Sequence, residues 1–431
     1  YSPEAWLASE SFVENVSRNI NASGQLRWDT PIKGLSLTGK AGVTYWTKYD
    51  KTYRAETYFD ENKTVGPSTL NIWTSNNTNT TLEALVNYEK TFGSHDLKVL
   101  AGTSVEQTSN KGLEGYRNTF PNNALYQLGA GDASTATNNS SLEEYALVSF
   151  FGRVNYAFKD KYLLEANLRY DGSSRFAKDN RWGIFPSVSA GWRISEENFW
   201  KNTRAGEVVN NLKLRASYGV LGNQNIGVYP YQQTYDLDHN YPLGNPATLV
   251  PGTYVSTYRN QDLTWEKTDQ FDAGIDFSFF NSVLTGSLDY YHKKTSDLLW
   301  EISVPSYIGQ STQLQNLGSL SNQGVELSLN ASLINKKDFQ WDMNFNISTN
   351  RSKVLSLGPD QEKPVGEHWG GYYSSILKVG SPVGLFYGQV YEGVLTQQDI
   401  DAGNLSARPG DPKFKNIPDD RNNSTVIGNA N

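Results

Sequence analysis

Three long segments between Tyr145 and Ile194 alternate strictly between apolar and polar side chains. In the middle segment, residues 162–170, Leu164 and Leu168 share one side, whereas Glu165 and Arg169 take the other. A period of two residues is typical of a β-strand with one buried face. The apolar side continues from end to end through all three segments, so any fold must cover one face of at least three neighbouring strands.

Either the core of a soluble sandwich or the hydrocarbon around a membrane barrel could cover such a face. A tilted membrane-spanning strand needs about 9 to 11 residues, whereas a strand of a soluble protein usually has about 5 or 6. Phe158 and Tyr162 flank the short turn at residues 159–161, as the aromatic girdle of a barrel requires. The length and the girdle favour an outer-membrane barrel, with apolar side chains toward lipid and charged ones toward a water-filled lumen.

Composition excludes several other classes of protein. No run approaches the roughly 18 apolar residues of a membrane helix, and the mean hydropathy is -0.57. Because the chain has 0 cysteines, it has no disulfide framework and no thiolate metal site. The net charge of -7 and the absence of a basic cluster argue against a nucleic-acid partner.

The 431 residues show no linker that would divide them, which predicts one continuous architecture. The chain starts at Tyr1 and ends as abruptly, so we expect an interior piece of a longer polypeptide.

Short turns alternate with long polar connections along the chain, which is the pattern of outer-membrane barrels. The short ones are expected near residues 30–34, 93–96, 159–161, 280–282 and 335–338. Long connections are expected from about residue 107 to Glu143 and from Leu221 to about Leu263. The strands between them are expected at 24–28, 35–49, 81–92, 97–106, 145–158, 162–170, 182–194, 212–220, 265–279, 283–291, 324–329 and 339–348. A dozen or more strands imply a wide lumen.

Several runs closely resemble the SusC/RagA family of TonB-dependent outer-membrane transporters. They are YDGSSRFAKDNRWGIFPSVSAGWRISEENFW from Tyr170, LKLRASYGVLGNQNIGVYPY from Leu212, LTWEKTDQFDAGIDFSFF from Leu263, YYHKKTSDLL from Tyr290, NLGSLSNQGVELSLN from Asn316 and PVGLFYGQVYEGV from Pro382. The resemblance covers most of the chain from about residue 140 onward. Before that point, only the strand pattern agrees.

This resemblance implies an all-β fold: a transmembrane, up-and-down antiparallel β-barrel with 22 strands in the family. Residues 1–431 would form part of that barrel, without the amino-terminal plug that binds TonB and without the last strands. The resemblance also implies import of oligosaccharides or peptides across the bacterial outer membrane, a SusD-like lipoprotein lid, and possible pairing of two transporter–lipoprotein units. The family's acidic DxNxDG-like run is replaced here by GDPKFKNIPDDRNN from Gly410, so we predict no calcium site.

Motifs that would carry enzyme chemistry are weak. Residues 34–40 imitate a phosphate-binding loop, but Ala41 stands where the hydroxyl is needed and the segment alternates as a strand. The four histidines, His95, His239, His292 and His368, have no metal-ligand spacing. We therefore predict no catalytic residue, no metal and no cofactor.

The second long connection offers the only candidate ligand or lid surface. Its aromatic rings can stack on sugars and peptides, and its amides can bond their polar edges. The candidates are Tyr229, Tyr231, Tyr235, Asp238, Asn240 and Tyr241. A purely structural loop is equally compatible with them. For the whole chain, a passive porin or structural barrel and a soluble carbohydrate-binding protein or glycosidase stay as alternatives.

Overall fold

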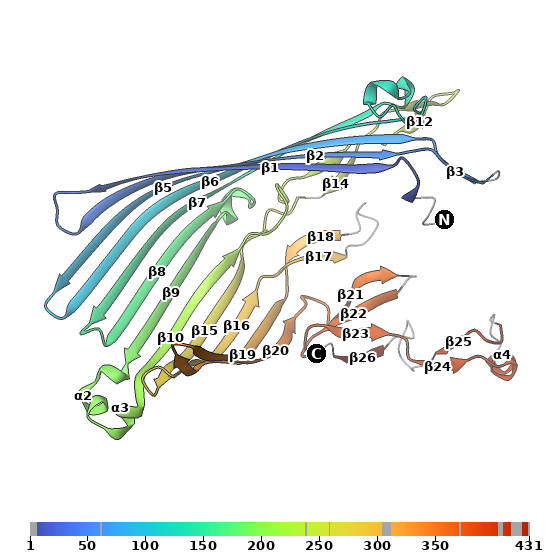
Figure 1. Ribbon diagram of the computed structural model, residues 1–431. Coiled ribbons are helices and arrows are strands. Elements are labelled where there is room, and N and C mark those ends of the chain that lie inside the picture. Colours follow the sequence, from blue (N-terminus) through green and yellow to red (C-terminus); the bar gives the residue numbers. More distant parts are fainter. Residues whose placement is uncertain are drawn as a thin grey trace. The chain divides into compact units, whose positions relative to one another are not determined.

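The computed structural model describes residues 7–60, 63–237, 239–257, 259–303, 312–369, 372–403, 408–414 and 425–429. Twelve strands form one antiparallel sheet in the order β1-β2-β5-β6-β7-β8-β9-β10-β15-β16-β19-β20, so neighbours in the sheet follow one another along the chain (Figure 1). This up-and-down order confirms the predicted fold class. Among the described residues, no helix combines the length and apolar character needed to cross a membrane.

The strands of this sheet are long. Their bounds are β1 Phe12–Asp29, β2 Leu35–Arg54, β5 Thr69–Phe92, β6 His95–Asn118, β7 Thr137–Phe158, β8 Tyr162–Ser173, β9 Trp182–Arg193, β10 Val209–Asn223, β15 Glu266–Phe279, β16 Leu284–Ser296, β19 Ser319–Lys336 and β20 Phe339–Ser356.

Shorter elements fill the long connections. The strands are β3 Thr57–Asp60, β4 Lys63–Val65, β11 Thr234–Asp236, β12 Tyr241–Leu243, β13 Thr248–Val250, β14 Tyr254–Thr257, β17 Leu299–Ser303, β18 Thr312–Asn316, β21 Glu362–Trp369, β22 Tyr372–Lys378, β23 Leu385–Gly388, β24 Tyr391–Val394, β25 Pro412–Phe414 and β26 Thr425–Asn429. The α-helices are α2 Asn198–Lys201, α3 Arg204–Val208 and α4 Gln397–Gly403, and the 3-10 turns are η1 Leu128–Ala130, η2 Ala133–Thr135, η3 Lys178–Asn180 and η4 Ile194–Glu196.

The chain divides into two compact parts. The first part comprises Tyr1–Asn155, Asn167–Ile184 and Asn225–Gln232; the second comprises Tyr156–Ala166, Phe185–Gln224 and Gln233–Asn431.

In the first part, β5 and β6 pair without interruption from Thr69↔Asn118 down to Phe92↔His95. This corrects the expected long connection from about residue 107 to Glu143, because β6 continues to Asn118 and β7 already begins at Thr137. Residues 74–81 of β5 are all Thr, Ser or Asn, so they show no apolar alternation. They remain a strand because they pair on both sides, with β2 and with β6.

Apolar side chains of the sheet's predicted lipid face are exposed rather than packed against a second sheet. On β20, the exposed fractions are 57% for Phe339, 51% for Trp341, 47% for Phe345 and 58% for Ile347. On β8, Leu164 and Leu168 are 51% and 53% exposed. A soluble protein rarely leaves so large an apolar face uncovered. The described residues therefore leave this apolar face open, as contact with lipid requires.

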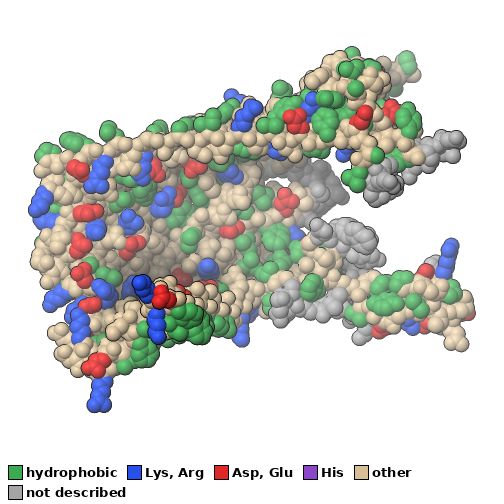
Figure 2. Space-filling model, in the orientation of Figure 1, with side chains coloured by type: hydrophobic (Ala, Val, Ile, Leu, Met, Phe, Trp, Pro, Cys, Tyr) green, Lys and Arg blue, Asp and Glu red, His purple; other side chains and the backbone are tan. Residues whose placement is uncertain are grey.

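Buried apolar side chains gather instead at the long-connection ends of the strands. In the first part, Tyr53, Leu70 and Phe120 form a cluster with Ala55. In the second part, Phe185 packs edge-on against Trp265 with ring centroids 5.2 Å apart. Acidic and basic side chains lie interspersed on the visible face of the sheet in Figure 2. The long connections therefore have small cores of their own, and the sheet is one layer with two different faces.

Candidate functional site

The connection between β10 and β15 folds into an arm, residues 234–257, that lies in the second compact part. Two short ladders are nested in it: β11 pairs with β14, and β12 pairs with β13 inside them. Gly244 closes the tip with a φ of +90°, a backbone conformation that glycine adopts without strain. Because β10 and β15 are joined here on the side opposite the short turns, the arm belongs to the side that faces away from the periplasm in outer-membrane barrels.

Apolar and aromatic side chains on the arm are exposed to solvent. Tyr235 is 58% exposed and Leu249 is 73% exposed. The rings of His239 and Tyr254 meet edge to face with centroids 4.3 Å apart, and the amide of Gln233 donates to the Tyr235 hydroxyl at 2.8 Å. Other exposed members are Leu237, Tyr241 and Leu243. So many exposed apolar groups on one short arm are typical of a contact surface.

The structure brings together only some of the candidate residues. Tyr235, Asn240 and Tyr241 lie on the arm and are exposed. Tyr229 and Tyr231 are half-buried in the first compact part, where Tyr229 has a φ of +61° and its carbonyl accepts from the amide of Gln232. Asp238 lies outside the described residues.

The sequence did not predict Tyr254, His239 and Leu249 as candidates. Tyr254 lies on β14, Leu249 lies on β13 and His239 lies between β11 and β12, so all three belong to the same arm. The signal that could have found them is the turn sequence Gly244-Asn245-Pro246-Ala247 between two three-residue β segments.

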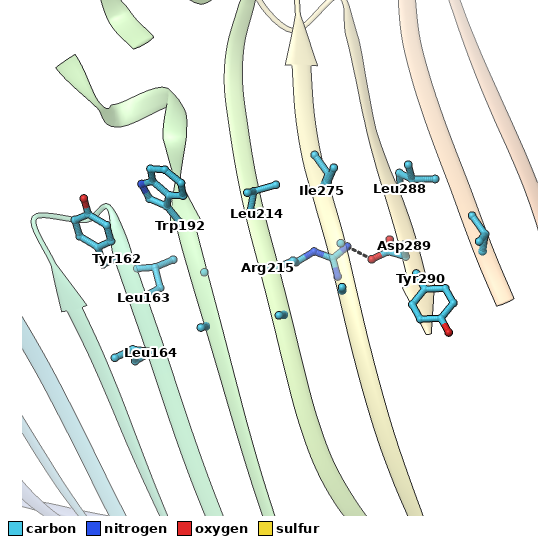
Figure 3. A pocket seen from close by; sticks show the side chains of 16 residues that line it. Tyr162, Leu163, Leu164, Trp192, Leu214, Arg215, Ile275, Leu288, Asp289 and Tyr290 are labelled. Carbon is cyan, nitrogen blue, oxygen red and sulfur yellow. Dashed lines mark ion pairs between the residues drawn. The ribbon is translucent and has the colours of Figure 1, made fainter. Parts of the chain in front are cut away.

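The inward face of the sheet carries a cluster of charged side chains on three neighbouring strands. The Arg215 guanidinium on β10 lies 2.5 Å from Asp289 on β16, the ion pair drawn in Figure 3. It also lies 3.1 Å from Asp276 on β15. Lys213 adds a longer contact of 3.8 Å to Asp276. One guanidinium with five donors can satisfy two carboxylates, so the cluster neutralises charges that a polar lumen must hold.

A shallow pocket of about 810 Å³ lies on the other side of the same strands. Its floor is a row of directly paired alanines, Ala190, Ala216 and Ala273. Larger outward side chains line one edge, one from each of four neighbouring strands, as Figure 3 shows: Trp192, Leu214, Ile275 and Leu288. Because these side chains belong to the lipid face, the pocket is a depression toward the membrane and not a place for a polar substrate.

At the short-turn end, Glu197 ties three neighbouring segments together. Its carboxylate accepts from Lys161 Nζ at 2.8 Å, from the Tyr162 hydroxyl at 2.7 Å and from Trp192 Nε1 at 3.3 Å. The hydrogen bond from Lys161, followed by that from Tyr162, lowers the pKa of Glu197 from 4.5 to about 2. This cluster fixes two girdle aromatics, Tyr162 and Trp192.

The family model described as "TonB dependent receptor-like, beta-barrel" matches residues 2–403, nearly the whole chain. The chain belongs to this family. As a TonB-dependent receptor-like barrel, it is an outer-membrane protein and not an enzyme. Among the described residues, no group of three His, Asp or Glu side chains is placed to hold a metal ion.

Named relatives and solved structures agree with this membership. The chain is 38% identical over 324 residues to TonB-dependent receptor P3 of Formosa agariphila, covering 74% of this chain and 32% of that protein. It is 39% identical over 281 residues to TonB-dependent receptor SusC of Bacteroides thetaiotaomicron, covering 63% of this chain and 27% of that protein. The RagAB peptide transporter structure matches with a TM-score of 0.80 and 27% identity, covering 91% of this chain and 42% of that one. The chain thus spans about a third of the relatives' length.

Proposed function

We propose that the protein is the barrel portion of a TonB-powered importer that takes up large nutrients, oligosaccharides or peptides, across the outer membrane. A SusD-like surface lipoprotein would close the mouth of the barrel, and two such transporter–lipoprotein units could pair. The observation that carries the proposal is the arm at residues 234–257, which presents exposed tyrosines on the long-connection side of a barrel that resembles the RagAB peptide transporter and SusC.

Exposed aromatic and aliphatic groups need an explanation in a segment that lies above the membrane. Leaving a Tyr or Leu side chain in water instead of burying it forgoes roughly 1.5 to 3 kcal/mol each. The arm exposes Tyr235, Leu237 and Leu249 together, so a partner that covers them gains much of that free energy. Tyrosine also suits partners of different chemistry, because its ring stacks on apolar surfaces and its hydroxyl forms hydrogen bonds. A protein lid and a sugar or peptide substrate are both recognised in this way.

The inward charges support a route for polar cargo. Arg215, Asp276 and Asp289 are each about a quarter to a third exposed on the lumen side, so this wall is wet and hydrogen-bonding. A wide lumen lined in this way suits a hydrated oligosaccharide or peptide better than an apolar compound. Active import differs from passive diffusion through a porin in its need for energy coupling.

Energy coupling separates the proposal from the passive porin. Uptake of labelled oligosaccharides and peptides would be measured in cells that express the full-length protein, with and without TonB. We expect uptake to be lost when TonB is deleted or when a protonophore is added. Uptake that continues in both conditions would show passive diffusion and would contradict the proposal.

The arm is tested separately with Tyr235→Ala combined with Tyr241→Ala. The matched control is Tyr58→Ala on β3, because Tyr58 is 74% exposed in a different long connection. The double variant should lower both import and co-purification of the surface lipoprotein at least several-fold, while the heat-modifiable band of the folded barrel is unchanged. Equal losses in the Tyr58→Ala control, or no loss in the double variant, would remove the arm from the mechanism.

A further inference from the structure

The outward face of β1, β2, β5 and β6 shows where the hydrocarbon band ends. On β2, outward apolar side chains run from Leu35 to Tyr45, ten residues apart. At about 3.4 Å per residue and a tilt near 40°, this stretch rises roughly 26 Å, the height of the apolar band of an outer-membrane barrel. Counted from the short turns, we place the upper edge of this band at Ile20 on β1, Tyr45 on β2, Leu82 on β5 and Val105 on β6, because the next outward residue on each strand is polar.

Beyond this band, one cross-strand row is wholly polar and carries two cations. Arg18 pairs with Thr47, Thr47 with Asn76, and Asn76 with Lys111. All four share the outward side of their strands with the apolar band, because each is an even number of residues from a band member. Arg18, Asn76 and Lys111 are exposed. The row presents positive charge, a hydroxyl and an amide toward the outside of the barrel.

Neither cation has a carboxylate partner among the described residues of the chain. On the outward side of these four strands, no Asp or Glu lies between the polar row and the apolar band. Two outward acids flank the row: Glu14, four residues from Arg18 on β1, and Glu144 on the next strand, β7, which accepts from the Ser109 hydroxyl at 3.2 Å. An unpaired cation at a membrane surface attracts the phosphates of the adjoining leaflet.

The two cations stand at different heights above the hydrocarbon. Arg18 is the first outward position after Ile20, which places it about 5 Å above the band. Lys111 is the third outward position after Val105, which places it about 15 Å above the band. A phospholipid has its phosphate directly above the acyl chains, so it reaches Arg18 alone. A lipid whose saccharide headgroup carries further phosphates reaches both.

We propose that Arg18, Thr47, Asn76 and Lys111 bind a phosphorylated glycolipid of the outer leaflet. The Arg18 guanidinium holds the phosphate nearest the acyl chains, and Lys111 holds a phosphate of the outer saccharide. Thr47 and Asn76 hydrogen-bond sugar hydroxyls between them. Three strand intervals of about 4.8 Å separate the two cations by roughly 14 Å along the row, which leaves room for the sugars.

The test uses full-length protein in detergent, titrated with rough lipopolysaccharide that has a phosphorylated inner core, with bound lipid counted by native mass spectrometry. Each cation near a charged surface changes affinity about fivefold, so Arg18→Gln with Lys111→Gln should weaken binding about twenty-five-fold. Lys111→Gln alone should weaken lipopolysaccharide binding without weakening the binding of phosphatidylglycerol. Heat-modifiable mobility confirms that the variants fold.

The matched control is Lys90→Gln, because Lys90 is an exposed outward cation on β5 at the opposite, short-turn edge of the band. This control should bind lipopolysaccharide as the wild type does, and lipopolysaccharide stripped of its phosphates should bind the wild type about as weakly as it binds the double variant. The proposal is overturned if the double variant keeps wild-type affinity, if the stripped lipid binds as well as the intact one, or if Lys90→Gln weakens binding equally.

Discussion

The hydroxyl of Tyr162 lies 2.7 Å from the carboxylate of Glu197, so a girdle aromatic at the start of β8 is tied to the segment that follows β9. The ring of Tyr162 also stacks near Trp192, with centroids 6.4 Å apart. One carboxylate thereby orients two aromatic side chains that sit where lipid headgroups begin. The short-turn edge of the sheet depends on the charge of Glu197.

Low pH should destabilise the short-turn edge of the sheet. The fold lowers the pKa of Glu197 from 4.5 to about 2, so its ionised form is favoured in the folded state. The resulting stabilisation is complete above pH 4.5 and is lost as the pH falls through 4.5 toward 2. Thermal unfolding in detergent should therefore show a larger fall in midpoint temperature between pH 5 and pH 2 for the wild type than for Glu197→Gln. Parallel curves for the two proteins would contradict this role.

Neighbouring positions on β8 should tolerate an arginine very differently. Leu168 is 53% exposed on the lipid side, about midway through the band, whereas Asn167 faces the lumen. An arginine at mid-depth on the lipid face costs about 2 to 4 kcal/mol. Leu168→Arg should therefore lower the free energy of unfolding in lipid vesicles by that amount, and Asn167→Arg should change it by well under half as much. Equal losses of unfolding free energy in the two variants would contradict the assignment of Leu168 to the lipid side and Asn167 to the lumen side.

The close approach of β9 to β10 should make Gly222 intolerant of a side chain. A Cβ at Gly222 would overlap the ring of Phe185, which is only 7% exposed and packs against Trp265. Overpacking of this kind costs about 1 to 3 kcal/mol, so Gly222→Ala should lower the unfolding midpoint in urea. Gly24→Ala is the control, because a Cβ at Gly24 meets nothing within 4 Å. A larger effect in the control than in Gly222→Ala would refute the packing argument.

The lumen charges should be energetically coupled. Arg215 Nη2 lies 2.5 Å from Asp289 Oδ1, and both side chains are partly exposed, so the pair is worth about 1 kcal/mol or less. A double-mutant cycle with Arg215→Met and Asp289→Asn should give a coupling of roughly 0.5 to 1 kcal/mol in urea unfolding. Strictly additive effects would show that the ion pair contributes nothing.

The facing of the strands could be read from the sequence because lipid imposes it on every second residue. Leu164 and Leu168 against Glu165 and Arg169 suffice to fix which side of β8 meets hydrocarbon. The halves of β5 and β6 on the long-connection side of the apolar band could not be predicted as strands in the same way. Above the band, neither face meets hydrocarbon, so Thr74 and Thr78 carry no alternation that would distinguish a strand from a loop.

The arm shows a different limit. The aromatic residues of the connection were visible in the sequence, but their partners were not. Tyr254 comes near Asp236 and His239 only through the nested ladders, and that pairing depends on backbone hydrogen bonds between distant residues. Tyr229 and Tyr231 lie close to Tyr235 in the sequence, but they belong to the other compact part.

The central claim is that lipid covers the apolar side of the strands and water the other, and a spin-label scan along β20 tests it most directly. The chain has 0 cysteines, so a single cysteine can be placed in it at each of residues 344 to 347. In vesicles, labels at Phe345 and Ile347 should be accessible to oxygen, and labels at Asn344 and Asn346 to a water-soluble nickel chelate. Alternation in the opposite phase, or no alternation at all, would contradict the account.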